Sequence, residues 1–316
     1  MYRPDDRYVW DFWLARDEGT WHMFHLQAPR TLAPDDRHWH ATVGHATSTD
    51  LRSWTPLASA IETGPPGEWD GLAIWTGSVI RHLSGRWLMA YTGIAREGAR
   101  AVERIGLAWS DDLITWSKDP ANPVIESDPL WYEEPGDSEW QHGWRDPCLV
   151  CSGQGYAMLI SARVKAAAAR GLAGAVALAI SPDGHTWKVM PPIEGTTGHF
   201  AQIEIPHLVH AGDLHHLVFC TNSDRPWPST DPDATVRVGT GAFSGPHALG
   251  PYRRAPAFID ADESGSRYGG RVFETGNGRL AYMAFLDGGS GAFQGAITDS
   301  SPVSFDTVAG RLRGPS

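Results

Sequence analysis

The feature that most constrains the fold of this chain is a pair of apolar runs joined by a glycine turn, which occurs five times. In the first unit, the apolar residues 9–14 and 21–26 flank Glu18-Gly19-Thr20. Glycine in a short break between two such runs is typical of a β-hairpin. The turn glycines of the five units are 66, 70, 57 and 66 residues apart, and they are Gly19, Gly85, Gly155, Gly212 and Gly278.

A second series of positions, upstream of the turns, keeps nearly the same spacing. These positions are 66, 69, 58 and 66 residues apart, and they are 11, 77, 146, 204 and 270. Two series that keep step in this way predict five structural repeats. We therefore expect the five upstream positions to be equivalent and to lie at similar depth on the innermost strands.

A third motif follows the hairpin in the first three units. Residues 44–54, 106–116 and 177–187 resemble one another and each ends in Trp, while residues 239–244 and 295–300 are looser copies. Each copy predicts a third strand, a turn and a fourth strand entered through Trp. Repeats of this size with four short strands are typical of propeller blades. The sequence therefore predicts an all-β fold, a five-bladed β-propeller of four-stranded antiparallel blades.

Length and charge narrow the class of protein. Five blades of about sixty residues use nearly all of the 316 residues, so we predict one catalytic domain over residues 1–316. A net charge of −11 argues against nucleic acid or an anionic membrane as a partner. No apolar run is long enough to cross a bilayer, and residues 1–7 carry no apolar core, so we expect no secretory signal. These features favour a cytoplasmic protein and leave its oligomeric state open.

Three smaller features carry no chemistry of their own in this interpretation. The cysteines are too few for a disulfide scaffold, and we interpret Cys148 and Cys151 as packing residues on a strand. His38-Trp39-His40 would place two imidazoles on one face of a strand, but no third ligand is evident. We expect no metal and no cofactor. The only helix is predicted at residues 164–171, as a short insertion at a blade edge.

The carboxylates of the upstream series point to a reaction. Asp11, Asp146 and Glu204 occupy three of its five positions, so they should meet around one central channel. Gathering them there is costly, because like charges raise one another's pKa. A bound cation or coincidence is one explanation, and glycoside hydrolysis, which uses two carboxylates, is another. The 15 Trp residues offer faces that suit sugar rings.

At this point the residues carry a family resemblance. Trp10-Asp11-Phe12-Trp13 resembles the Trp-Asp-x-Trp segment of levansucrases, glycoside hydrolase family 68, and residues 22–27 and 44–54 resemble invertases and fructanases of family 32. Trp75-Thr76-Gly77-Ser78 is similar to the aromatic-Ser-Gly-Ser segment of both families. Arg145-Asp146-Pro147 matches their Arg-Asp-Pro motif, and Glu204-Ile205-Pro206 resembles the Glu-Cys-Pro motif of family 32. The motifs stand in family order.

The resemblance implies a retaining glycoside hydrolase that acts on a furanoside through a covalent glycosyl-enzyme. It implies β-fructofuranosidase-type cleavage of sucrose or short fructo-oligosaccharides, with Asp11 as nucleophile, Glu204 as general acid and then base, and Asp146 as stabiliser of the transition state. Candidates for binding this small sugar substrate are Trp10, Gln27, Trp75, Ser78 and Arg145. Repeat geometry adds Tyr268 and Arg271 on the fifth inner strand.

Departures from the family patterns keep alternatives open. The Asn-Asp-Pro-Asn-Gly segment of family 32 is absent, no residues remain for its C-terminal β-sandwich, and residues 202–205 lack the acidic pair of family 68. The exact sugar, its linkage and the balance between hydrolysis and fructosyl transfer therefore stay open. One alternative is an inverting α-L-arabinofuranosidase or β-xylosidase like those of family 43. Another is a carbohydrate-binding propeller without catalysis.

Overall fold

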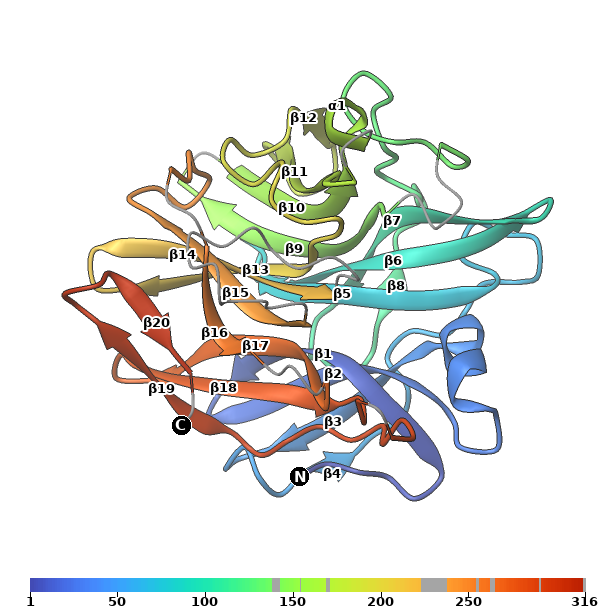
Figure 1. Cartoon of the computed structure of the whole chain (residues 1–316). Coiled ribbons are helices and arrows are strands. Elements are labelled where there is room, and N and C mark those ends of the chain that lie inside the picture. Colours follow the sequence, from blue (N-terminus) through green and yellow to red (C-terminus); the bar gives the residue numbers. More distant parts are fainter. Residues whose placement is uncertain are drawn as a thin grey trace.

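The chain forms five four-stranded antiparallel sheets arranged around a common centre (Figure 1). This computed structural model describes residues 1–137, 143–153, 155–168, 171–222, 238–253, 256–261, 265–289 and 291–314. Each sheet consists of four strands that are consecutive in the sequence, so each is one blade. The predicted five-bladed propeller is confirmed.

The first three blades follow the chain from its N-terminal end. The first contains β1 (Arg7–Asp17), β2 (Thr20–Pro29), β3 (Thr42–Ser48) and β4 (Thr55–Pro56). The second contains β5 (Ala73–Arg81), β6 (Trp87–Glu97), β7 (Arg100–Ser110) and β8 (Ser117–Lys118). The third contains β9 (Arg145–Ser152), β10 (Gly155–Arg163), β11 (Gly174–Ser181) and β12 (Lys188–Met190).

The last two blades complete the ring. The fourth contains β13 (Glu204–Ala211), β14 (Leu214–Asn222), β15 (Val238–Gly245) and β16 (Ala257–Ala261). The fifth contains β17 (Arg267–Gly276), β18 (Arg279–Leu286), β19 (Ser301–Asp306) and β20 (Arg311–Arg313). The first strands of neighbouring blades contact one another, so β1, β5, β9, β13 and β17 form the inner wall of the ring.

The glycine turns close the inner hairpins as the spacing predicts. Gly19, Gly85, Gly212 and Gly278 have φ angles of +89°, +85°, +60° and +70°. Glycine adopts this left-handed conformation at little steric cost because it has no Cβ. The corresponding turn of the third blade includes Gln154, which lies outside the described residues.

The hydrophobic core lies between blades rather than in one central mass. One cluster of buried side chains joins the first blade to the second and the fifth, and three further clusters join blades two and three, three and four, and four and five. Phe219 of β14 and Phe243 of β15, for example, stack with ring centroids 4.9 Å apart in the cluster shared with the third blade. Apolar burial of this kind stabilises each blade through its neighbours.

The third-strand motif is confirmed in four blades and only in part in the fifth. Trp54, Trp116 and Trp187 stand directly before β4, β8 and β12, and residues 239–244 lie within β15. Residues 295–300 form no third strand, because that role belongs to β19. Residues 295–298 nevertheless make backbone hydrogen bonds with β18, and Ile297 also exchanges two with Tyr2, of 2.8 and 2.9 Å. This segment therefore joins the fifth blade to the N-terminus and helps to close the ring.

Three local expectations have different outcomes. The strand expected at His38-Trp39-His40 is wrong, because these residues lie in a 3-10 helix, η1 (Pro34–His40), which begins with proline at its first turn. The predicted helix is confirmed as α1 (Lys165–Ala168), shorter than expected, with residues 169 and 170 outside the described part. All three cysteines are free, Cys148 half-buried and Cys151 exposed. No helix among the described residues is long and apolar enough to span a membrane.

Candidate active site

Each inner strand is interrupted near the centre of the ring by a β-bulge. The pairing between the first and second strands shifts register at this depth in every blade, at Asp11, Thr76, Asp146-Pro147, Ile205-Pro206 and Gly269-Gly270. Asp11, Asp146, Ile205 and Gly269 have φ angles between +30° and +63°. A bulge leaves its extra residue unpaired and re-aims side chains, so the strands can turn functional groups toward the axis.

The bulges define which residues of the five blades are equivalent. The residues directly before the bulges all line one central cavity, and they are Trp10, Trp75, Arg145, Glu204 and Tyr268. The next ring, formed by the first bulge residues, consists of Asp11, Thr76, Asp146, Ile205 and Gly269. The expected equivalence of positions 11, 77, 146, 204 and 270 is therefore wrong by one residue in three blades. Glu204 corresponds to Arg145, one position before the ring that holds Asp11 and Asp146.

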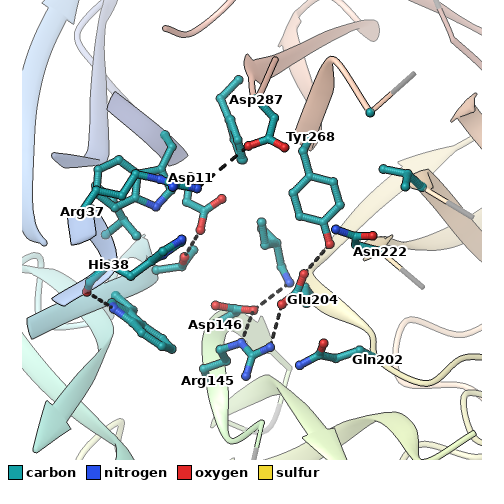
Figure 2. A pocket seen from close by; sticks show the side chains of 18 of the residues that line it. Asp11, Arg37, His38, Arg145, Asp146, Gln202, Glu204, Asn222, Tyr268 and Asp287 are labelled. Atoms are coloured by element: carbon teal, nitrogen blue, oxygen red, sulfur yellow. Dashed lines mark hydrogen bonds and ion pairs between the residues drawn. The ribbon is translucent and has the colours of Figure 1, made fainter. Parts of the chain in front are cut away.

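The central cavity has a volume of about 930 Å³ and receives side chains from all five blades. Figure 2 shows the carboxylates of Asp11, Asp146 and Glu204 directed into it. Its wall includes residues that stand outside the inner strands, namely Arg37, His38 and Trp39 of η1, Gln202 before β13, Asn222 at the end of β14, and Asp287 after β18. The sequence-based prediction that three acids meet in one channel is confirmed.

The surroundings of Asp11 change the pKa of its carboxyl group. Its Oδ2 atom accepts a hydrogen bond of 2.9 Å from the hydroxyl of Thr76 in the neighbouring blade. Burial raises the pKa of Asp11 to about 7, and the charges of Asp146 and Glu204 act in the same direction. The Thr76 hydrogen bond and the charge of Arg271 oppose this rise. Near neutral pH, Asp11 is therefore close to the point at which it gains or loses its proton.

Asp146 lies in the cavity wall and is almost fully buried. Its Oδ2 atom accepts hydrogen bonds from the Ser161 hydroxyl at 2.9 Å and from the Ile205 N–H at 3.0 Å. Burial raises the pKa of Asp146, and Arg145, whose Nε lies 3.9 Å from Oδ2, opposes that rise. The bond to Ile205 ties the third bulge to the fourth, because each residue sits in the bulge of its own blade.

Glu204 is more accessible than Asp146, with 21% of its side chain exposed against 4%. Arg145 donates from Nη2 to Oε1 at 2.6 Å, and the Tyr268 hydroxyl donates to Oε2. Arg145 is itself anchored to the buried Glu103 at 3.1 Å. Burial, followed by the charge of Glu204, raises the pKa of Tyr268 well above its ordinary value, so the phenol keeps its proton and acts as a donor. Two donors therefore orient this carboxylate.

The other sugar-binding candidates divide into two groups. Trp10, Trp75, Arg145 and Tyr268 line the cavity. Gln27, Ser78 and Arg271 lie behind its wall, and each makes a hydrogen bond there. Gln27 donates to Ser59 at 2.8 Å, Ser78 accepts from the Leu149 N–H at 2.8 Å, and Arg271 donates from Nε to the Phe12 carbonyl at 2.9 Å.

Sequence reasoning missed several residues of the wall. Arg37, Trp39, Gln202, Asn222 and Asp287 carry no repeat signal, because they belong to connecting segments whose lengths differ between blades. His38 was considered only as a metal ligand. No group of three metal-ligating side chains occurs among the residues that the structure describes. Thr76 could have been found, since it stands where both families have serine in their aromatic-Ser-Gly-Ser segment.

The arrangement suits two-step acid and base chemistry at one carbon atom. One half-buried carboxylate with a pKa raised to about 7 and a second carboxylate oriented by two donors are the groups that glycoside hydrolysis needs. A third carboxylate, held in place by hydrogen bonds from Ser161 and Ile205, can stabilise positive charge in the cavity. Trp10 and Trp75, both almost fully buried, add apolar surface to the same wall.

A comparison with protein families finds one match over most of the chain. The model "Glycosyl hydrolases family 32 N-terminal domain" matches residues 13–288. The match begins two residues after Asp11, so the motif around this acid lies outside it.

Two curated relatives illustrate the likeness in sequence. The "Extracellular sucrase" of Zymomonas mobilis is 26% identical over 259 residues, which cover 67% of this chain and 61% of the sucrase. "Beta-fructofuranosidase 1" of Zea mays is 34% identical over 116 residues, which cover 35% of this chain and 16% of that enzyme. The chain thus spans about three fifths or less of the length of these relatives.

Solved structures share the fold over nearly the whole chain. An inulosucrase from Halalkalicoccus jeotgali bound to kestose has a TM-score of 0.78 at 20% identity, covering 98% of this chain and 87% of that one. A sucrose-6-phosphate hydrolase from Lactobacillus gasseri has a TM-score of 0.73 at 19% identity, covering 97% of this chain and 62% of that one. These similarities show the propeller fold.

Proposed function

Because the chain belongs to glycosyl hydrolase family 32, we propose that it is a retaining β-fructofuranosidase that cleaves sucrose or short fructo-oligosaccharides. The observation that carries the proposal is that Asp11 of β1 and Glu204 of β13 project from different blades into one cavity, with Asp146 beside them (Figure 2). The names of the sucrase and β-fructofuranosidase relatives support the choice of sugar.

The proposed first step forms a glycosyl-enzyme. The Asp11 carboxylate bonds to the anomeric carbon of the fructosyl unit while the bond from that carbon to the glycosidic oxygen breaks. Glu204 gives its proton to the departing oxygen. Asp146 binds hydroxyl groups of the same sugar and stabilises the positive charge that develops on its ring. Arg145 and Tyr268 hold Glu204 in position for the transfer.

The proposed second step releases the sugar. Water loses a proton to Glu204 and attacks the anomeric carbon, which displaces Asp11 as a carboxylate. Another sugar hydroxyl in place of water would give fructosyl transfer. Asp11 must be ionised to begin the cycle, so kcat/KM is expected to fall as the pH drops below the pKa of about 7.

The test is release of monosaccharide from sucrose, short fructans and aryl arabino- and xylofuranosides. Wild type is expected to release fructose, and Asp11→Asn and Glu204→Gln to lose roughly 10³-fold or more of that rate. Asp111→Asn is the matched control, because this acid is exposed and pairs with Arg86 at 3.0 Å outside the cavity. Fructose release that survives both cavity substitutions would contradict the proposal.

Two further readouts separate the alternatives. Release of arabinose or xylose would favour the family 43-like hydrolase, and sugar binding without release would favour a non-catalytic propeller. Methanol as acceptor reports the stereochemistry, since retention yields the methyl β-fructofuranoside and inversion yields the α-anomer. A cytoplasmic location remains a prediction, supported by three free cysteines, while the Zymomonas mobilis relative is named as extracellular.

A further inference from the structure

An ion pair that takes no part in the proposed reaction stands beside Asp11 at the seam between the first and fifth blades. It joins Arg37 of η1 to Asp287, which follows β18. Both residues line the central cavity, and Figure 2 shows the contact between them on the side of the cavity that holds Asp11. Burial lowers the pKa of Arg37, and the charge of Asp11 is among those that raise it against this lowering.

The Arg37 guanidinium is fixed in place but incompletely used. Its side chain is only 9% exposed, and it lies 3.7 Å from the ring centroid of Phe293 and 5.5 Å from that of Trp10. Such stacking holds the plane of a guanidinium and leaves its edge free to donate. Nη1 donates to the Pro34 carbonyl at 2.7 Å, whereas Nη2 makes no hydrogen bond with a described residue.

Asp287 offers the complementary groups. Its side chain is 40% exposed, and the nearest atom of Arg37, Nη2, lies 3.9 Å from its Oδ1. That separation is too long for a hydrogen bond. Within the described part of the chain, the Asp287 carboxylate accepts no side-chain or backbone hydrogen bond. A free donor and a free acceptor therefore face the cavity less than two hydrogen-bond lengths apart.

We propose that Arg37 and Asp287 form a hydroxyl-binding pair that makes the site selective for neutral sugars over phosphorylated ones. The inference rests on the proposed function, because it concerns the sugar that docks against Asp11. One hydroxyl can accept from Arg37 and donate to Asp287 at the same time, since it carries both a proton and lone pairs. The pair thus binds substrate and does not act on the reacting atoms.

The negative charge of Asp287 accounts for the selectivity. A phosphate group has only acceptors to offer near neutral pH, so it can pair with Arg37 but repels Asp287. A neutral hydroxyl satisfies both groups. The neighbouring charges favour the same outcome, because Asp11, Asp146 and Glu204 all line the same cavity.

The experiment compares sucrose with sucrose phosphorylated on the fructosyl C6 hydroxyl, in wild type and Asp287→Asn. The substitution keeps the size of the side chain and removes its charge. For sucrose, kcat/KM is expected to fall roughly tenfold, mostly through KM, because the lost hydrogen bond acts on substrate binding. For the phosphorylated sugar it is expected to rise, so the ratio of the two values changes by more than tenfold.

Two further variants serve as a control and as a second test of the pair. Asp111→Asn removes the charge of an exposed ion-pair partner outside the cavity and is expected to change neither value. Arg37→Lys keeps the positive charge but loses the flat, stacked donor, and it is expected to raise the KM for sucrose with kcat little changed. Thermal unfolding of every variant reports whether the fold is intact. A ratio in Asp287→Asn within twofold of wild type would overturn the inference.

Failure of the proposed function would look different. In that case wild type would release fructose from neither sugar. Binding of fructose and of fructose 6-phosphate, followed by quenching of tryptophan fluorescence, would then test the pair by itself. Preference for the neutral sugar that is lost in Asp287→Asn would support the pair, and equal preference in both proteins would contradict it.

Discussion

Two regions that recur around the ring differ in what they repeat. The turn after the third strand keeps both its residues and its hydrogen bonds in the first three blades. The Ser hydroxyl donates to the Asp Oδ1 two residues later at 2.9, 3.0 and 3.0 Å, in the pairs Ser48–Asp50, Ser110–Asp112 and Ser181–Asp183. That Oδ1 also accepts from the two backbone N–H groups that follow.

The bulge on the inner strand repeats its backbone and changes its side chains. All five blades shift register at this point, yet the residue before the bulge is Trp, Trp, Arg, Glu or Tyr, and the first bulge residue is Asp, Thr, Asp, Ile or Gly. Local hydrogen bonding stabilises the turn in the same way in these three blades, so its residues are the same in each. One shared cavity needs different chemistry from each blade, so its residues diverge.

The largest effect is expected in the free energy of unfolding, which should depend on pH with opposite signs through the bulge and through the turn. Between pH of about 4 and about 7, folded Asp11 holds a proton that the unfolded chain has lost, so the free energy of unfolding falls as the pH rises through this window. Asp11→Asn cannot ionise and is expected to gain stability over wild type, by as much as about 4 kcal/mol at pH 8. Urea unfolding of both proteins at pH 5 and pH 8 measures the difference.

The turn after the third strand should contribute to stability with the opposite dependence on pH. Hydrogen bonds from the Thr186 and His185 N–H groups hold the pKa of Asp183 at about 2, below its ordinary value. Its contribution is therefore present above pH of about 4 and is lost as the pH falls toward about 2. An advantage of Asp11→Asn that is the same at both pH values would contradict the assignment of the raised pKa to this carboxylate.

The second prediction concerns the donors of Glu204. Tyr268→Phe removes the hydroxyl that donates to Oε2, so the carboxylate keeps only its bond to Arg145. We expect kcat/KM for fructose release from sucrose to fall roughly 10- to 100-fold, because a hydrogen bond to a charged group is lost. Tyr252→Phe is the matched control, since that hydroxyl donates to the Ala248 carbonyl away from the cavity. Equal losses in both variants would indicate a general effect on folding.

The smallest effect is expected in the turn. Asp183→Ala removes the acceptor of three hydrogen bonds at an exposed site, and we expect a loss of about 1 kcal/mol or less in the free energy of unfolding. Activity should stay within twofold of wild type, because the turn touches no cavity residue. Asp112→Ala should change stability in the same direction, since its turn makes the same bonds. Loss of activity without loss of stability would break the distinction between the two regions.

The ring of blades was accessible from sequence because hairpins are local structures. Alternating apolar runs and turn glycines are read over ten to twenty residues, and five copies in step leave few alternatives. The motifs around Asp11, Asp146 and Glu204 named the acids for the same reason. The fifth third-strand motif was met only in part, since residues 295–298 pair with β18 of their own blade but also with the N-terminal segment, and the third strand itself begins later, at Ser301.

The register of the cavity was not accessible in this way. Counting from turn glycines places Gly77, Glu204 and Gly270 level with Asp11, whereas the bulges place Thr76, Ile205 and Gly269 there. A bulge adds one residue without a characteristic sequence, so distance along the chain no longer measures depth in the ring. The three acids still meet, because Glu204 stands directly before its bulge and its side chain still lines the cavity.

The amino-acid sequence by itself determined the number of blades, their order and the acids of the central channel, because these follow from short-range patterns of apolar residues, glycines and motifs. Only the tertiary structure decided which residues share a level, which donors hold Glu204, and that Arg37 meets Asp287. Those relations join segments as far apart as 250 residues. They depend on how the five blades close into one ring, and patterns over ten or twenty residues do not show which distant segments this closure brings together.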